Sequence, residues 1–263
     1  MIRKLSENDR KQVLQFLSEE AAINLFIIGD IENFGFKKDF MDLWGSFNNE
    51  EEIEGVLLRY HESFIPYYKN SNFDVAGFKE IINKYEGKKI ISGKNNIVDD
   101  FKDIVQGAKE KSTYFCELKN KEKLIKDYGN ILTAKVSDSK KIYDLLETID
   151  EFNATDTNSL ERIENGITTK AGRIYFMKNE YGEAITTAQT TAENKYSAMV
   201  VSVATRKEYR GKGLMGQCLS KLCSDLLNED KTLCLFYDNP EAGKVYHRIG
   251  FETIGKWKML IKL

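Results

Sequence analysis

The most informative hydrophobic pattern in the chain spans residues 198–227 and predicts a strand, a glycine turn and a long helix. Residues 199–203 are rich in β-branched side chains, which is typical of a buried strand. From Leu214 to Leu227 apolar residues recur at helical spacing with polar residues opposite, which predicts an amphipathic helix. Between them lie two glycines and four basic residues: Gly211, Gly213, Arg206, Lys207, Arg210 and Lys212. Because backbone N–H groups gather at a helix N-terminus, this turn predicts a binding site for a phosphate or pyrophosphate.

Other interpretations of the glycine turn make different demands on the sequence. A Walker loop needs Ser or Thr after its Gly-Lys pair, whereas Gly213 follows Lys212. The spacing of Gly211, Gly213 and Gly216 matches GxGxxG, but a dinucleotide fold also needs an acidic residue at the end of a second strand about 20 residues later. At that distance the chain is still leaving its helix, at Asp230, so we reject the dinucleotide interpretation. A tight strand–helix bend that binds nothing stays open as the plainest alternative.

The rest of the pattern predicts helices and strands in both halves of the chain. Helical spacing predicts helices at residues 9–17, 23–31, 73–85, 96–105, 159–165 and 239–248. Alternating or continuous apolar runs predict strands at residues 2–5, 40–47, 53–60, 62–68, 89–92, 111–118, 172–177, 183–191, 232–237 and 251–261. We expect Ser6 to cap the first helix, Gly166 to end the helix before it, and Asn239 with Pro240 to start the last helix. The mixture predicts a protein of the α/β (α+β) class.

The beginning of the chain repeats near its middle. The segment from Asp138, DSKKIYDLL, matches the segment from Asp9, DRKQVLQFL, with Ile142 over Val13. Each segment follows a strand-like opening, and a charged stretch, KNKEKLIKDYGN, separates the two halves as a crossing segment would. We therefore expect a tandem of two α/β units, residues 1–128 and 129–263.

Composition and charge narrow the range of partners. Of the 263 residues, 41% are hydrophobic and 30% are charged, as in an ordinary globular protein. A net charge of −2 gives no reason to expect nucleic acid or an anionic membrane as a partner, and no apolar run is long enough to span a bilayer. The four cysteines form no CxxC pair and the chain has two histidines, so we expect no metal site and reduced cysteines in a cytoplasmic protein.

Two motifs in the second half resemble those of the GNAT superfamily of acetyl-CoA-dependent N-acetyltransferases. The first motif, Arg/Gln-x-x-Gly-x-Gly/Ala, compares with RGKGLM at residues 210–215, where Met215 stands in place of the preferred Gly or Ala. The second motif, Asn-x2-Ala-x3-Tyr-x3-Gly-Phe, is complete in Asn239, Ala242, Tyr246, Gly250 and Phe251. The resemblance covers the chain from about residue 131 and implies a mixed, mostly antiparallel sheet flanked by helices. The N-terminal half lacks both motifs, so the resemblance implies a degenerate GNAT-like copy there.

The resemblance also implies a role for each matching residue. The backbone of Val201, Ser202 and Val203 would pair with the pantetheine arm of acetyl-CoA. The N–H groups of the turn would hold its pyrophosphate, from Arg210, Gly211, Lys212, Gly213, Leu214 and Met215. Asn239 would lie near the pantetheine, and the small side chain of Ala242 would leave room for the cofactor. Tyr246 would protonate the departing thiolate as a general acid, the plainer alternative being a half-buried helix aromatic.

These motifs predict an N-acetyltransferase that moves an acetyl group from acetyl-CoA to a primary amine of a small molecule or peptide. The alternative is a sensor or regulatory protein that binds acetyl-CoA without turnover, and a third candidate uses a longer acyl group. The complete second motif favours the enzyme. Residues 198–205 contain no acid to serve as a base, and we expect His247 to be an exposed helix residue. The sequence leaves the oligomeric state open between monomer and homodimer.

Overall fold

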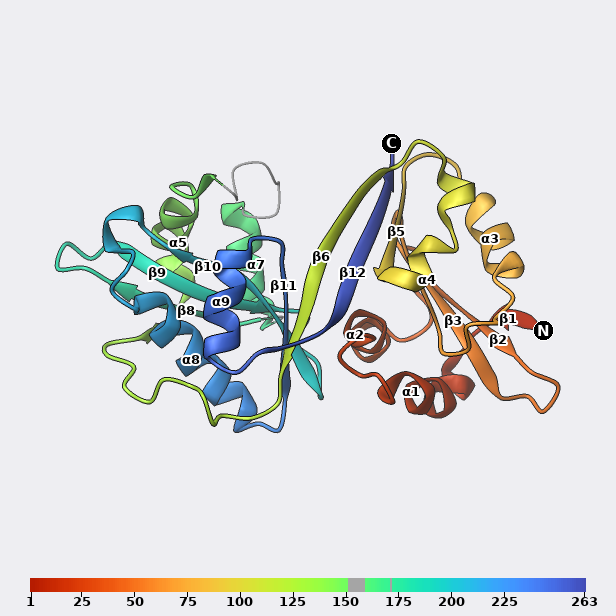
Figure 1. Ribbon diagram of the computed structural model, residues 1–263, viewed down its shortest axis with the longest axis horizontal. Coiled ribbons are helices and arrows are strands. Elements are labelled where there is room, and N and C mark those ends of the chain that lie inside the picture. Colours follow the sequence, from red (N-terminus) through yellow and green to blue (C-terminus); the bar gives the residue numbers. More distant parts are fainter. Residues whose placement is uncertain (151–158, 171) are drawn as a thin grey trace. The chain divides into compact units, whose positions relative to one another are not determined.

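The computed structural model describes residues 1–150, 159–170 and 172–263, and the chain divides into two compact units (Figure 1). Unit 1 comprises residues 1–115 and 254–263, and unit 2 comprises residues 116–253. The predicted division of function between residues 1–128 and 129–263 stays a prediction. Within the described ranges, none of the helices has the length and apolar character that a membrane crossing requires.

Unit 1 is a mixed sheet with short helices. Its strands follow the order β1 (Ile2–Lys4), β2 (Met41–Phe47), β3 (Ile53–Tyr60), β4 (Ser63–Tyr68), β5 (Lys89–Lys94) and the end of β12 (Glu252–Lys262). Neighbouring strands pair antiparallel, except that β4 and β5 are parallel. The helical elements are η1 (Glu7–Asp9), α1 (Arg10–Ser18), α2 (Leu25–Phe34), α3 (Ala76–Asn83), α4 (Asn95–Asp99) and η2 (Lys102–Val105). Strand β6 (Lys109–Leu118) then carries the chain into unit 2.

Unit 2 has the same kind of sheet. Its strands follow the order β7 (Leu132–Thr133), β8 (Ile174–Lys178), β9 (Ala184–Thr191), β10 (Ser197–Thr205) and β11 (Thr232–Tyr237). The pairs are antiparallel except β10 with β11, which is parallel. The helical elements are η3 (Val136–Asp138), α5 (Ser139–Leu146), α7 (Leu160–Thr169), η5 (Lys207–Tyr209), α8 (Leu214–Leu227) and α9 (Pro240–Arg248). Strand β12 then returns the chain to unit 1.

The two units repeat one order of elements. Each runs through a strand, two helices, three antiparallel strands, a helix, a parallel strand, a helix and a final strand (Figure 1). The final strand divides between the units, because residues 116–118 of β6 belong to unit 2 and residues 254–262 of β12 belong to unit 1. The predicted fold class, a tandem of mixed α/β units, is confirmed.

The opening turns explain why the repeat is visible in the sequence. In each unit an aspartate accepts a backbone N–H from three residues earlier, from Ser6 to Asp9 Oδ2 at 2.8 Å and from Lys135 to Asp138 Oδ2 at 3.1 Å. Such a bond satisfies a donor that the first helical turn leaves without a partner. The residue four positions after each aspartate is fully buried: Val13 in α1 and Ile142 in α5.

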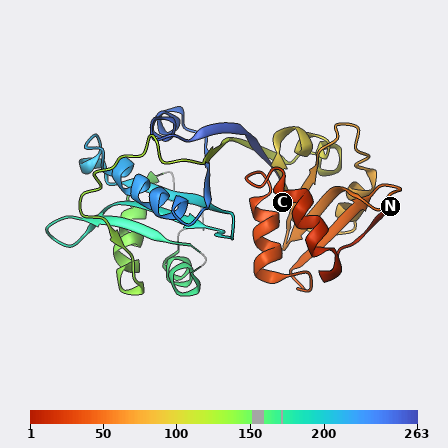
Figure 2. The same cartoon turned by 90° about the horizontal axis from the view of Figure 1, so that it is seen from below.

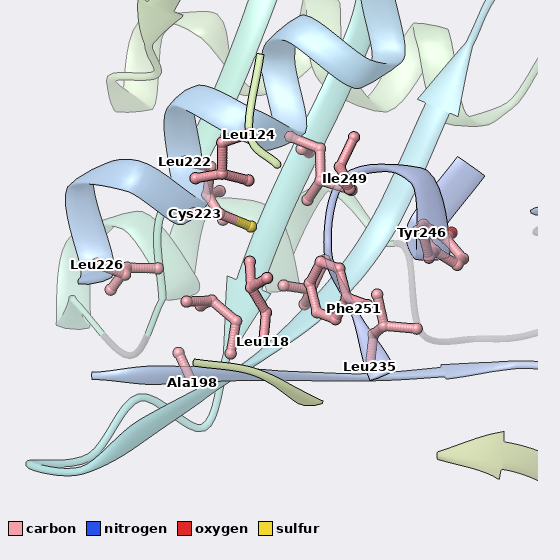
Figure 3. Close-up of a cluster of buried hydrophobic side chains, with 14 of the residues drawn as sticks. Leu118, Leu124, Ala198, Leu222, Cys223, Leu226, Leu235, Tyr246, Ile249 and Phe251 are labelled. Atoms are coloured by element: carbon pink, nitrogen blue, oxygen red, sulfur yellow. The ribbon is translucent and has the colours of Figure 1, made fainter. Parts of the chain in front are cut away.

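Two hydrophobic clusters cover the two faces of the sheet of unit 2. Helix α8 packs on one face, mainly against β9 and also against β10 and β11, while α5 packs on the other face against β9 and β10 with α7 beside it. Figure 2 shows the blue α8 and the green α5 and α7 on opposite sides of the sheet. Leu222 and Leu226 of α8 meet Ile249 and Phe251 in the first cluster, with Tyr246 at its margin (Figure 3). Tyr246 thus lies where the core gives way to the cavity described below.

Two predicted helices differ from the structure. The helix predicted to end at Gly166 continues to Thr169 as α7, because Ile163 and Ile167 pack into the core on either side of the glycine. Helix α7 ends instead where Lys170 adopts a left-handed backbone conformation, with φ of 56°. The helix predicted at residues 96–105 is divided into α4 and the 3-10 turn η2.

Candidate active site

The glycine turn joins β10 to α8 and leaves its backbone open. Gly211 and Gly213 have φ values of 79° and 76°, a conformation that only glycine adopts at little cost. A Cβ atom built on either glycine would meet no heavy atom within 4 Å, so open space lies beside both residues. Arg210 is anchored at the start of the turn by its Nε, which donates to the Thr205 carbonyl oxygen at 3.1 Å. A negatively charged group could approach these N–H groups and the α8 N-terminus directly.

Strands β10 and β11 begin as a parallel pair and then diverge. Their register runs from Ser197–Thr232 to Val200–Leu235, although β10 continues to Thr205. On its other side, β10 slips against β9 between Val201 and Ala204, and within this bulge Ser202 has a φ of +48°. A β-bulge bends the strand that contains it. The bend therefore lies where the pairing with β11 stops.

Helix α9 starts and ends as the sequence predicts. The Asn239 side chain caps it by accepting the Glu241 backbone N–H at 2.9 Å, and Pro240 occupies the first helical position. This start fixes the rotation of the helix and places Tyr246, two turns later, against the core on one side and the cavity on the other.

A cavity of about 590 Å³ brings these elements together within unit 2. Predicted site residues that line it are Val203, Arg210, Gly211, Gly213, Leu214, Met215, Asn239, Ala242 and Tyr246. The other predicted site residues, all of which are described, do not line it: Val201, Ser202 and Lys212. Val201 and Ser202 lie in or beside the bulge, and the Lys212 ammonium lies over the Tyr209 ring, 5.0 Å from its centroid.

Tyr246 is a buried phenol at the wall of this cavity. Its side chain packs against the rings of Tyr237 and Phe251, with centroid distances of 5.9 and 6.1 Å, and the residue is 9% exposed. Burial, reinforced by the nearby Cys116 thiol, raises the pKa of Tyr246 to about 12. The phenol therefore carries its proton at neutral pH and can donate it.

Further cavity residues escaped the prediction from sequence. Val245 lies on α9 three residues after Ala242, so helical periodicity could have found it, and Glu241 and Arg248 follow from Val245 at spacings of four and three residues. Tyr237 and Asp238 end β11, beside the predicted Asn239. Ile149 comes from the end of the α5 segment, about 50 residues before β10, and no local signal points to it.

Among the described residues, no group of three or more His, Cys, Asp or Glu side chains could hold a metal ion. The four cysteines are buried free thiols, and burial raises the pKa of each one. The polar groups that line the cavity include backbone amides, phenols, carboxylates and guanidinium groups.

Comparisons with known proteins agree with this geometry. A family model described as GNAT acetyltransferase matches residues 47–260. No curated protein matches the chain in sequence.

Solved structures with the same fold cover nearly the whole chain. A Drosophila protein from a structural genomics consortium has a TM-score of 0.72 at 10% identity, covering 98% of both chains. A GCN5-related N-acetyltransferase from Sphaerobacter thermophilus has a TM-score of 0.65 at 13% identity, covering 100% of this chain and 95% of that one. A tandem GNAT protein from the clavulanic acid biosynthesis pathway has a TM-score of 0.59 at 14% identity, covering 99% of this chain and 97% of that one. At these identities the likenesses show the fold.

Proposed function

Because this chain belongs to the GNAT acetyltransferase family, we propose that it transfers an acetyl group from acetyl-CoA to a primary amine of a small molecule or peptide. One observation carries the proposal: the open glycine turn and the buried phenol of Tyr246 face the same cavity in unit 2. An anion-binding turn and an acid that face one space suit a substrate with a diphosphate at one end and a thioester at the other.

Each part of acetyl-CoA has a matching group in the cavity. The N–H groups of residues 210–215, with the Arg210 guanidinium, would hold the pyrophosphate. The backbone of residues 201–203 would pair with the pantetheine arm where β10 parts from β11. Asn239 and Ala242 would border that arm at the start of α9. The same assignment gives Lys212 a supporting role, as a cation outside the cavity that attracts the phosphates.

The chemistry then requires two proton transfers. A neutral amine attacks the thioester carbonyl carbon, and the carbon–sulfur bond breaks as the amide forms. Tyr246 gives its proton to the departing thiolate, and the phenolate then takes one of the protons of the amine nitrogen, which becomes positively charged when it bonds to carbon. The raised pKa of Tyr246 suits the second of these transfers, because the phenolate of a phenol with a high pKa takes up a proton readily.

A direct assay tests the proposal. Calorimetry with acetyl-CoA is expected to show binding between micromolar and millimolar concentrations, and a panel of amines and peptides is expected to release free CoA thiol. Absence of binding would contradict the proposed cosubstrate. The free, buried cysteines suit a reducing compartment, so we place the reaction in the cytoplasm.

Met215 favours a second candidate function. Its side chain lines the cavity at the position where the family motif prefers Gly or Ala, and β10 carries no carboxylate to serve as a base. A protein that binds acetyl-CoA as a sensor needs no base and tolerates a narrower turn. Such a sensor would bind acetyl-CoA in the calorimeter and release no thiol with any member of the panel.

A further inference from the structure

A second phenol lines the cavity and is hydrogen-bonded to a histidine. Tyr237, at the end of β11, lies in the cavity wall, and its Oη is 3.1 Å from His247 Nε2 on α9. Tyr237 also packs against the ring of Tyr246, the proposed acid. The imidazole itself is exposed. Tyr237 thus connects the cavity to a titratable group in contact with solvent.

The direction of this hydrogen bond follows from the other nitrogen of the imidazole. His247 Nδ1 lies 2.8 Å from the Phe251 carbonyl oxygen, which can only accept. In the neutral imidazole Nδ1 therefore carries the proton, and Nε2 presents a lone pair. Tyr237 Oη donates to that lone pair. If the proton crosses to Nε2, the resulting imidazolium keeps its bond to the Phe251 carbonyl.

The local sequence holds Tyr237 in this position. A Cβ atom at Gly243 would lie 2.5 Å from the Tyr237 ring carbon Cε2 and 2.8 Å from Cζ. The ring therefore lies directly on the backbone of α9, where glycine alone leaves room for it. Since Gly243 and His247 are four residues apart, they occupy the same face of the helix. One face of α9 thus supplies both the seat of the phenol and its hydrogen-bond partner.

Other polar and charged groups lie near His247 or line the cavity. The Thr253 hydroxyl lies 3.4 Å from Nε2, and behind that hydroxyl lies the Cys116 thiol, 3.4 Å away, whose pKa burial raises. The charged residues on α9 include the exposed cations Lys244 and Arg248 and the carboxylate Glu241, which lines the cavity and pairs with Lys244 at 2.7 Å. Asp238, just before the helix, also lines the cavity. The imidazole is hydrogen-bonded to the cavity phenol and belongs to an exposed residue, so it connects that phenol to solvent.

We propose that Tyr237 and His247 form a proton relay that carries the proton of the substrate ammonium from the cavity to solvent. This inference rests on the proposed acetyl transfer, because an amine that arrives protonated must lose one proton before it attacks. That proton passes to Tyr237 Oη while the Tyr237 proton passes to His247 Nε2, and the imidazolium releases a proton to water. Tyr246 remains responsible for the thiolate. The relay supplies the base that β10 lacks, with Tyr237 as the catalytic residue and His247 acting through it.

The test compares Tyr237→Phe and His247→Gln with the wild type at two pH values, using an aliphatic amine that the wild type accepts. At pH 7 we expect kcat to fall by about 10²-fold in both variants, the usual contribution of a general base. At about pH 10, where much of an aliphatic amine is already neutral, we expect the loss to shrink to roughly threefold or less. The dissociation constant of acetyl-CoA is expected to stay within about twofold of the wild type, since both changes are nearly isosteric. His61→Gln, at the other histidine of the chain, is the control and leaves both rates unchanged.

Chemical rescue separates the relay from a structural role. Because His247 is exposed, added imidazole is expected to restore the activity of His247→Ala at pH 7 several-fold, and to do nothing for Tyr237→Phe. An equal loss at both pH values without rescue would show that the two residues only shape the cavity, which overturns the relay. Full activity of both variants at pH 7 overturns it as well, while leaving acetyl transfer intact. Absence of turnover in the wild type overturns the proposed function, and the relay with it.

Discussion

The two units share one order of elements but treat the same turn in opposite ways. In unit 2 the turn after β10 bares two glycines beside open space. In unit 1 the turn after β4 carries Phe73, whose ring stacks on Tyr68 with a centroid distance of 4.6 Å. That ring also covers Gly55 so closely that a Cβ atom there would lie 2.7 Å from it. The turn that lies beside open space in unit 2 thus has as its counterpart in unit 1 a turn that carries a packed aromatic side chain.

The strands before the two turns differ in the same sense. Counted from the last parallel pair of each unit, Pro66 in β4 takes the place of Ser202 in β10. Proline has no N–H to offer to a ligand, and β4 pairs with β3 without a register shift, whereas β10 contains the bulge. Helix α4 ends after five residues, at Asp99, before the position at which α9 presents Tyr246. Packing preserves the fold in both units, whereas the proposed binding of acetyl-CoA depends on a few local features that unit 1 does not share.

The largest expected effect comes from removing the hydroxyl of Tyr246, the proposed general acid in unit 2. Tyr246→Phe is expected to lower kcat roughly 10²- to 10³-fold, since a general acid contributes on that scale, and to leave acetyl-CoA affinity within about twofold. Steady-state kinetics and calorimetry measure the two effects. Tyr181→Phe, at a side chain 80% exposed, is the control. A Tyr246→Phe variant with full activity would assign the acid role elsewhere.

Removing the Phe73 side chain from unit 1 tests whether its volume alone prevents that unit from binding acetyl-CoA. Phe73→Ala is expected to lower the free energy of unfolding by roughly 2–3 kcal/mol, less than a fully buried Phe loses, because Phe73 is half-buried. Chemical denaturation measures the loss. The variant still has Pro66 in β4, and its unit 1 still has no counterpart of the glycine turn. Calorimetry is therefore expected to show the same number of bound acetyl-CoA molecules per chain as in the wild type. Binding of an additional acetyl-CoA molecule would mean that the Phe73 side chain alone keeps the ligand out of unit 1.

The repeated aspartates provide a comparison of stability. Arg3 donates to both Asp9 oxygens, at 3.0 and 2.6 Å, and this pairing lowers the pKa of Asp9 to about 2 against the opposing effect of burial. Burial raises the pKa of Asp138, but the Lys135 backbone and the Lys141 side chain lower it overall. Because the folded pKa of Asp9 lies below its unfolded value, its contribution is complete above about pH 4 and is lost as the pH falls towards 2.

Asp9→Asn is therefore expected to lower the free energy of unfolding by about 2 kcal/mol at pH 7, and by about half of that at pH 3. Denaturation curves at the two pH values check the prediction. Asp138→Asn, at a more exposed aspartate without an arginine partner, is expected to cost less. If Asp9→Asn lowers the free energy of unfolding equally at both pH values, the packing of this side chain contributes to stability and its charge does not.

Much of the fold could be predicted from the sequence because many of its elements depend on residues that are close together in the chain. The Asp9 and Asp138 repeat, the helix at 214–227 and the Asn239 cap depend on side chains within four residues of one another. That most of the last strand, β12, belongs to unit 1 could not be predicted, because the alternation at residues 251–261 identifies a strand and leaves its partner open. That partner, β5, lies about 170 residues earlier.

The candidate site divides in the same way. The glycine turn and Tyr246 belong to compact motifs, so the sequence predicts them. The roles of Gly243 and Phe73 depend on which ring lies against which backbone, and a one-dimensional pattern contains no such information. In the sequence, Tyr237 is only a residue of a predicted strand, because its contact with α9 is not visible there. For this reason the mechanism predicted from the sequence included no base.

The smallest expected effect tests whether the open glycine turn of unit 2 binds acetyl-CoA. Gly213→Ala places a Cβ atom in open space, so its cost is conformational, about 1–2 kcal/mol for a left-handed residue. The turn can relieve that strain by rotating its amides away, and the acetyl-CoA dissociation constant is then expected to rise about tenfold, which corresponds to 1.4 kcal/mol. Gly182→Ala is a matched control in the same unit, with φ of 81° and equally open surroundings in a hairpin turn. It is expected to cost similar stability and to leave binding unchanged. If calorimetry shows equal affinity for the two variants, the amides of the glycine turn do not hold the ligand, and the contrast between the units rests on Tyr246 and the bulge alone.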